Sequence, residues 1–158
     1  MSRPTRLHEA IPQGWFSWSY DLLRGDRIES EIVLESLDLG TIRHDGETFS
    51  VRRTGWTGPW VLTTKAGEPI AEAEKPSPFS YRFLTEHGES RFFFEPEGPF
   101  SRAMILYDAE DEEPVGCVEP KHMLSRNILA ELPVDLSPTF RAFLVWMTLM
   151  TWRRRKQR

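Results

Sequence analysis

The chain has 158 residues, a mass of 18.4 kDa and 39% apolar residues, which suits one folded domain and excludes a wholly disordered chain. Twenty basic and twenty-four acidic residues leave a formal charge of −4, so we expect no nucleic-acid partner. The single cysteine, Cys117, excludes an intramolecular disulfide and a cysteine-based zinc site. It favours a reducing, cytoplasmic location.

The N-terminal residues and the longest apolar stretch bear on targeting. Residues 1–13 lack the apolar core of a signal peptide, and we expect them to form a flexible N-terminal segment. The longest apolar stretch covers 140–152 and is interrupted by Arg141. About 20 residues are needed to cross a bilayer, so the sequence predicts no transmembrane span and leaves peripheral attachment as the way to reach a membrane.

Turn signals recur along the first hundred residues. Gly25, Gly46, Gly67 and Gly88 are evenly spaced, and an Asp or Glu follows each of them. Asp45-Gly46 suits a type I′ hairpin turn. Apolar and polar residues alternate between the turns, for example over 16–22, which is the period of a half-buried strand. The pattern predicts a hairpin turn, two strands and the next hairpin turn, repeated.

We count about eleven strands at a spacing of roughly ten residues, which is typical of an all-β barrel or sandwich. The acidic residues of 108–113 then form one more hairpin loop. The predicted fold class is mainly β, a closed antiparallel β-barrel of about 11–12 strands threaded by a C-terminal apolar helix.

The helix is predicted over 137–152, because Ser137-Pro138 forms an N-cap followed by proline at the first helical position. Its apolar residues fall on every side, so the helix has to be buried on all sides. A sheet that closes around it meets this requirement. We therefore predict one domain over 14–152 and a basic tail over 153–158.

The barrel with its terminal helix resembles the tubby C-terminal-like superfamily, which includes the LURP-one-related proteins and the phospholipid scramblases. The resemblance rests on the pattern of 114–120, on Leu132-Pro133 and on the helix 137–152. It implies lipid binding in some relatives and no defined function in many small bacterial ones. The phosphoinositide-binding motifs of tubby proteins and the cysteine cluster of scramblases are missing from this sequence, so no residue role is carried over.

No residue pattern indicates catalysis, and we predict a protein that is not an enzyme and has no cofactor or metal. Cys117 lies beside acidic residues that raise rather than lower a thiol pKa, which favours a small buried residue. The four histidines lack the spacing of metal ligands, and the acidic loop 108–113 lacks the calcium-loop order.

Basic residues give the functional hypothesis. The tail adjoins Trp152, a position suited to an interfacial anchor, and a polybasic run attracts anionic lipid. Arg52 and Arg53 are adjacent, so on a strand one of them would face the barrel interior and need an anionic partner, unless the strand ends at Val51. The candidate lipid-binding residues are Arg52, Arg53, Arg153, Arg154, Arg155 and Lys156.

The first hypothesis is peripheral binding to anionic phospholipid membranes. The alternative is a protein-interaction or scaffold domain without a ligand, with Trp56 as the candidate contact to a protein partner. A hollow small-molecule carrier is disfavoured, because a helix outside such a barrel would show a polar stripe.

Overall fold

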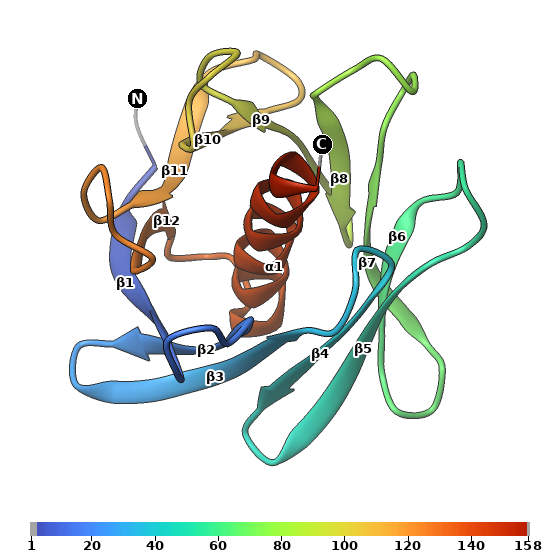
Figure 1. Ribbon diagram of the computed structural model, residues 1–158. Coiled ribbons are helices and arrows are strands. Elements are labelled where there is room, and N and C mark those ends of the chain that lie inside the picture. Colours follow the sequence, from blue (N-terminus) through green and yellow to red (C-terminus); the bar gives the residue numbers. More distant parts are fainter. Residues whose placement is uncertain (1–2, 158) are drawn as a thin grey trace.

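The computed structural model describes residues 3–157, and in this range twelve antiparallel strands close into a barrel around one helix (Figure 1). This confirms the predicted fold class. Neighbouring strands follow chain order, and the first strand pairs with the last to close the barrel. The elements are β1 (Thr5–Pro12), β2 (Ser19–Arg24), β3 (Arg27–Leu34), β4 (Leu39–His44), β5 (Glu47–Arg53), β6 (Trp60–Thr63), β7 (Pro69–Glu74), β8 (Phe83–His87), β9 (Ser90–Pro96), β10 (Met104–Asp108), β11 (Pro114–Pro120), β12 (Ile128–Pro133) and α1 (Pro138–Lys156).

The evenly spaced glycines occupy turns, as predicted. Gly25, Gly46, Gly67 and Gly88 all have positive φ angles, a region that glycine adopts without steric cost. Asp45 also has a positive φ of 52°, so both central residues of the β4–β5 turn fit the type I′ hairpin. The even spacing therefore reports a repeated hairpin geometry.

The N-terminal segment is a correction to the sequence analysis, because residues 5–12 form β1 and close the barrel. β1 pairs with β12 on one side and with β2 on the other. Its alternation is inverted: His8 and Ala10 point inward and are buried, whereas Leu7 and Ile11 lie on the outer surface. A pattern that buries a histidine and exposes a leucine conceals a strand from a search for hydrophobic periodicity.

The second correction concerns where two strands begin. The strand predicted from Phe16 begins at Ser19, and Tyr81 precedes β8 instead of belonging to it. Trp15 and Phe16 lie in the loop before β2, with 90% and 94% of their surface exposed. Aromatic residues that looked like strand residues are therefore loop residues.

The helix α1 begins as predicted but continues one turn further. Ser137 is the N-cap, and its side chain accepts a hydrogen bond from the amide of Phe140. The helix continues to Lys156, so residues 153–156 are its last turn and not a separate tail. Arg158, also counted in the predicted tail, lies outside the described residues. Leu144 and Trp146 are fully buried, as a helix enclosed by strands requires.

One close contact fixes the helix against the wall. The indole of Trp146 donates a hydrogen bond to the carbonyl of Val33 on β3 at 3.1 Å. A Cβ at Gly40 on β4 would lie 1.9 Å from the same indole nitrogen, so only glycine leaves room for the ring. Gly40 and Trp146 therefore set the position of the helix inside the barrel.

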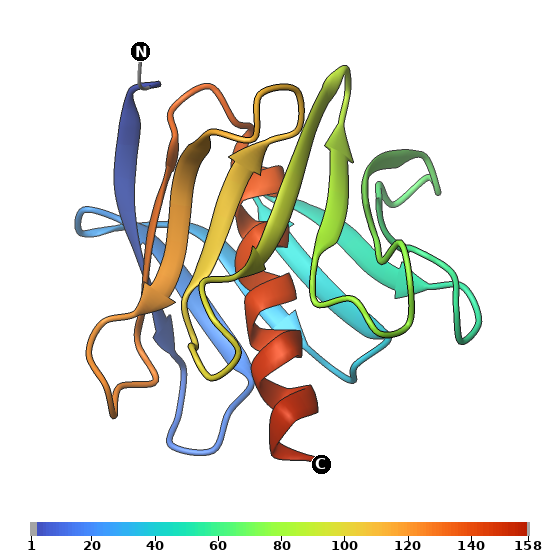
Figure 2. The same ribbon diagram turned by 90° about the horizontal axis from the view of Figure 1, so that it is seen from above.

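The loops alternate between the two ends of the barrel, and their charges differ (Figure 2). The end where α1 begins, here called the acidic end, consists of the loops 25–26, 45–46, 64–68, 88–89, 109–113 and 134–137. Lys65 is the one base in these loops, and their acids are Asp26, Asp45, Glu68, Glu89, Glu110, Asp111, Glu112, Glu113 and Asp135.

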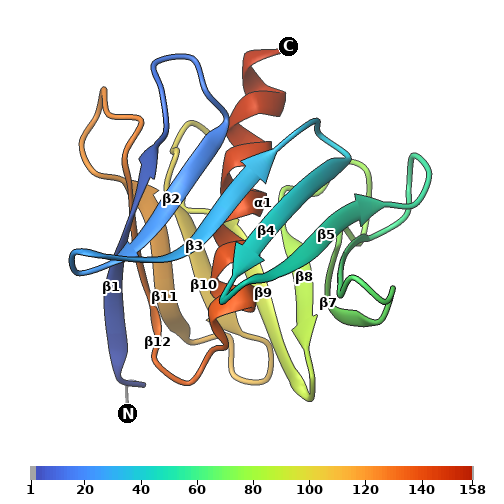
Figure 3. The ribbon, with the colours of Figure 1, turned by 90° about the horizontal axis from the view of Figure 1, so that it is seen from below.

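The opposite end, here called the basic end, consists of the loops 13–18, 35–38, 54–59, 75–82, 97–103 and 121–127 and the last turn of α1 (Figure 3). Its acids are Glu35, Asp38 and Glu97. Its bases are Lys75, Arg82, Arg102, Lys121, Arg126, Arg153, Arg154, Arg155 and Lys156. The charges of the loops and of the helix terminus therefore differ between the two ends, although Arg24 and Arg27 flank the acidic-end loop 25–26.

Candidate functional site

Large apolar side chains are exposed on five of the six loops at the basic end. Seven of them are between 85% and 96% exposed, and Tyr81 is 59% exposed. The loops of the acidic end expose one comparable side chain among the described residues, Val134 at 37%. The basic-end set is Trp15 and Phe16, Trp56, Phe79 and Tyr81, Phe100, and Met123 and Leu124.

Several cations of the basic end are held by backbone carbonyls and not by carboxylates. Arg102 donates to the carbonyls of Met123 and Ser125, and Arg126 donates to those of Gly14, Trp15 and Ser17. A carbonyl orients a guanidinium and leaves its charge in place. These contacts tie the loops together and keep the surface positive.

The last turn of α1 shows the same arrangement. Arg153 donates to the carbonyls of Leu34 and Glu35, and Arg155 donates to that of Ser101 at 2.6 Å. Within residues 3–157, neither these two arginines nor Lys156 forms an ion pair. Some of their charge complements the C-terminal end of the helix dipole, and the remainder faces solvent.

Two bases of this end are neutralised by carboxylates. Arg82 runs along the outer wall and pairs with Glu95 and Glu112, both at 3.0 Å. Lys121 pairs with Glu9 at 3.2 Å. Most of the other bases of this end lie at the helix terminus, at Arg102 and at Arg126 in the loop 121–127.

The structure brings most of the predicted basic residues together. The strand β5 extends through both Arg52 and Arg53, so their side chains do lie on opposite faces. Arg53 lies 4.1 Å from the ring centre of the buried Trp60, with Arg154 at 5.8 Å from the same ring. The ring, together with the carbonyl of Gly58, takes the place of the anionic partner expected for Arg53. Arg52 is exposed on the outer wall, apart from the helix terminus.

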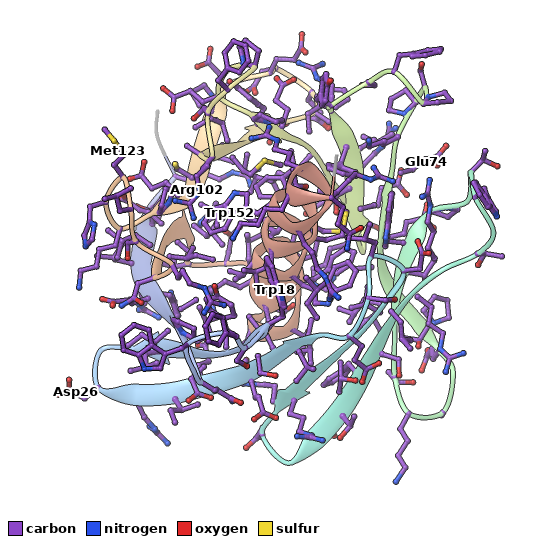
Figure 4. The ribbon with its side chains drawn as sticks, in the orientation of Figure 1. Trp18, Asp26, Glu74, Arg102, Met123 and Trp152 are labelled. Atoms are coloured by element: carbon purple, nitrogen blue, oxygen red, sulfur yellow. The ribbon has the colours of Figure 1, made fainter. Side chains whose placement is uncertain are left out.

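A pocket of about 410 Å³ opens beside the helix terminus. Its walls combine cations with aromatic and aliphatic side chains, and none of the described residues lining it carries a carboxylate. In Figure 4 Arg102 and Trp152 lie next to each other near the helix, with Met123 farther out. The lining residues are Trp18, Tyr20, Arg102, Met123, Leu124, Ser125, Arg126, Trp152, Arg155 and Lys156.

Burial changes the electrostatics in this pocket. Partial desolvation lowers the pKa of Arg102, opposed by the nearby Tyr20. Burial also raises the pKa of Tyr20, against the positive charge of Arg126. A guanidinium that has lost part of its hydration without gaining a carboxylate is poised to interact with an anion.

Trp152 does not serve as the interfacial anchor that the sequence suggested. Its side chain is buried beneath Arg102, whose guanidinium carbon is 4.1 Å from the indole centre. The indole N–H donates to the carbonyl of Arg102 at 2.9 Å. The exposed Trp15, Trp56 and Phe100 occupy the positions that could meet an interface.

Cys117 on β11 is half-buried, and not fully buried as the sequence analysis expected. Burial and the nearby Glu119 and Glu97 raise its pKa to about 12, in the direction that its acidic neighbourhood predicted. In residues 3–157 there is no cluster of histidine, cysteine and carboxylate side chains suited to a metal ion. The acidic residues of 109–113 form the β10–β11 hairpin loop, and Arg3 donates a hydrogen bond to Asp108 at the end of β10.

Sequence reasoning identified Trp56 but missed the other exposed apolar loop residues and the two loop-tying arginines, Arg102 and Arg126. Signals existed in Gly14-Trp-Phe16, in the Pro-Phe pairs at 78–79 and 99–100, and in Met123-Leu124, since each places a large apolar residue next to a loop-forming one. That these residues lie at one end of the barrel follows only from the structure, in which successive loops alternate between the two ends.

No protein-family model, curated protein or solved structure gave a significant match to the chain. Within residues 3–157, no helix has both the length and the apolar character needed to cross a membrane.

Proposed function

We propose that the chain is a non-catalytic tubby-like domain whose basic end binds the surface of membranes rich in anionic phospholipids. One observation carries the proposal: within residues 3–157, the most exposed apolar side chains lie at the same end of the barrel as Arg102, Arg126, Arg153, Arg155 and Lys156, none of which pairs with a carboxylate. Stable peripheral attachment needs two contributions, because one shallow apolar insertion or one basic patch alone binds weakly. The basic end supplies both.

The energetics favour this end. Each basic residue near an anionic leaflet contributes about 1 kcal/mol. Tryptophan is well suited to the headgroup region, because its ring is large and its N–H stays hydrated. Trp15, Trp56 and Phe100 lie on three separate loops of the basic end, so apolar contacts to a membrane surface can come from several loops. The acidic end would be repelled by the same surface.

The test is co-sedimentation of the full chain with vesicles. We expect binding to phosphatidylcholine vesicles that contain phosphatidylglycerol, weaker binding at 0.15 M than at 0.02 M salt, and none to pure phosphatidylcholine. Phe100→Ser should weaken binding several-fold. Ile28→Ser, which also removes an exposed apolar side chain but from β3 next to the acidic-end loop 25–26, should leave it unchanged. Equal effects of the two variants, or equal binding to neutral and anionic vesicles, would refute the proposal.

Substitutions are better than truncation for the basic residues. Residues 153–156 are helical and Arg155 holds the loop at Ser101, so removing 153–158 would also disturb the barrel. The double variants Arg153→Gln/Arg154→Gln and Arg155→Gln/Lys156→Gln each retain the helix and remove two charges. Both should weaken vesicle binding to a similar extent, because a membrane responds to the summed charge.

The alternative is a protein-interaction domain. The observation in its favour is Trp56, which is 93% exposed on the loop 54–59, a loop that itself contains no basic residue. Exposed tryptophan is frequent at the centres of protein interfaces. Two results together would support this alternative. A protein partner would bind the wild type but not Trp56→Ala, and the wild type would not bind vesicles.

A further inference from the structure

We infer that the pocket beside the helix terminus binds one amphiphile whose head is a phosphate monoester, such as a phosphatidic acid. The inference deepens the proposed function and rests on it, since it assigns a single-molecule site within the basic end. Vesicle binding needs only summed charge and shallow insertion. A pocket of about 410 Å³ has room to distinguish one head group from another.

The head-group class follows from the charges. Four cationic side chains line the pocket, namely Arg102, Arg126, Arg155 and Lys156, and the described lining includes no carboxylate. Such a site favours the ligand with the most negative charge per head. A phosphate monoester carries about −1.5 to −2 charges at pH 7, whereas a phosphodiester or a carboxylate carries one.

The guanidiniums are oriented in advance. Two nitrogens of Arg102 are held by the carbonyls of Met123 and Ser125, and two of Arg126 by carbonyls of the loop 13–18. Each guanidinium has five N–H groups, and the carbonyls leave some of these donors for a ligand. Binding then costs little ordering of these side chains, which increases affinity and selectivity.

The apolar part of the lining distinguishes a lipid from free phosphate. Trp18 and Trp152 form aromatic walls, and Met123 and Leu124, 85% and 91% exposed, stand at the side open to solvent. Inorganic phosphate makes no use of these side chains. An acyl chain or glycerol backbone attached to the phosphate covers them, so both parts of the ligand contribute.

The helix terminus provides a matched pair of variants. Arg155 and Lys156 line this pocket. Arg153, 5.5 Å from the ring centre of Trp18, and Arg154, 5.8 Å from that of Trp60, do not line it. The double variants Arg155→Gln/Lys156→Gln and Arg153→Gln/Arg154→Gln remove the same charge from the same turn. The long-range attraction between the chain and an anionic lipid should weaken equally in both variants. Only Arg155→Gln/Lys156→Gln removes cationic side chains from the pocket lining.

The experiment is calorimetric titration of the full chain with dihexanoyl phosphatidic acid below its micelle concentration, without vesicles. Dihexanoyl phosphatidylcholine and inorganic phosphate serve as comparison ligands, and the indole resonances of Trp18 and Trp152 report the location. We expect the phosphatidic acid to bind at least tenfold more tightly than either comparison ligand and to shift both resonances. The Arg155→Gln/Lys156→Gln variant should lose at least tenfold in affinity, and the Arg153→Gln/Arg154→Gln variant less than twofold.

Three results would overturn the inference: equal affinity for inorganic phosphate, equal losses in the two double variants, or no binding of the soluble lipid. If the soluble lipid fails to bind while anionic vesicles do, the pocket inference is wrong and the proposed function stands. If the soluble lipid binds as expected while vesicles do not, the pocket is supported and membrane attachment is refuted.

Discussion

The two ends of the barrel use charged residues in opposite ways. At the acidic end, Arg141 of α1 is buried and donates to Glu29 on β3 at 2.9 Å, while the buried His8 approaches the same carboxylate at 3.2 Å without the alignment of a hydrogen bond. At the basic end, arginines donate to backbone carbonyls and keep their charge. The difference indicates that charge beside the acidic end holds the helix in place, whereas these arginines of the basic end have no carboxylate partner within residues 3–157.

The largest effect is expected where the helix passes between the two ends. Leu144→Asp buries an unpaired carboxylate in the core, which costs more than the whole stability of a domain. We expect an aggregated or unfolded protein by circular dichroism. Leu144→Met, of similar volume, should fold with a cost below about 1.5 kcal/mol. A cooperatively folded Asp variant would contradict the central position of the helix.

Breaking the buried pair tests the comparison directly. Arg141→Met leaves Glu29 without its hydrogen-bonded cation and should cost about 3–5 kcal/mol in urea unfolding. Arg153→Gln at the basic end should change the free energy of unfolding by less than about 0.5 kcal/mol. Similar losses in the two variants would show that both ends serve stability.

Acid should weaken the acidic end in particular. Burial opposes ionisation of Glu29, but His8 and the charge of Arg141 outweigh it and lower its pKa from 4.5 to about 2. Because the folded pKa is lower than the unfolded one, the stabilisation is complete above pH 4.5 and disappears as the pH falls towards 2. It amounts to about 3 kcal/mol.

The pH dependence of urea unfolding between pH 5 and 2 checks this expectation. Glu29→Gln should flatten that dependence, since the variant has no carboxyl at this position to protonate. A variant that retains the wild-type slope would assign the acid sensitivity to other carboxylates.

A smaller effect is expected from Gly40→Ala. The added Cβ would lie 1.9 Å from the Trp146 indole, and such overpacking typically costs about 1–3 kcal/mol. Gly98→Ala, in a basic-end loop with open space around the new Cβ, is the matched control and should be near neutral. Thermal unfolding of both variants would measure the contrast. A neutral Gly40→Ala would show that the helix can shift within the barrel.

Local patterns predicted the barrel and its helix well. The spacing of Gly25 to Gly88 indicated hairpins, and Ser137-Pro138 with an all-round apolar helix indicated enclosure by strands. The strand β1 was missed because it buries His8, whose contact with Glu29 arises from residues far apart in the sequence. Periodicity measures apolar burial alone and overlooks a strand with a polar inward side chain.

The candidate site was predictable only in part. The basic run from Arg153 to Lys156 was visible in the sequence, because adjacent residues form one turn of the helix. Arg102 and Arg126 come from separate loops and join this turn through the barrel's closure. Long-range assembly of this kind leaves no local signal, and it is the reason that the pocket emerged only from the structure.

The most direct test of the account is to determine which end of the barrel touches a membrane. In a Cys117→Ser background, an environment-sensitive fluorophore is attached to Cys in place of Thr57 at the basic end, or of Asp26 at the acidic end (Figure 4 labels Asp26). With anionic vesicles, the account predicts a brighter, blue-shifted emission from position 57 and an unchanged emission from position 26. A response at position 26 alone, or at both positions equally, would contradict it.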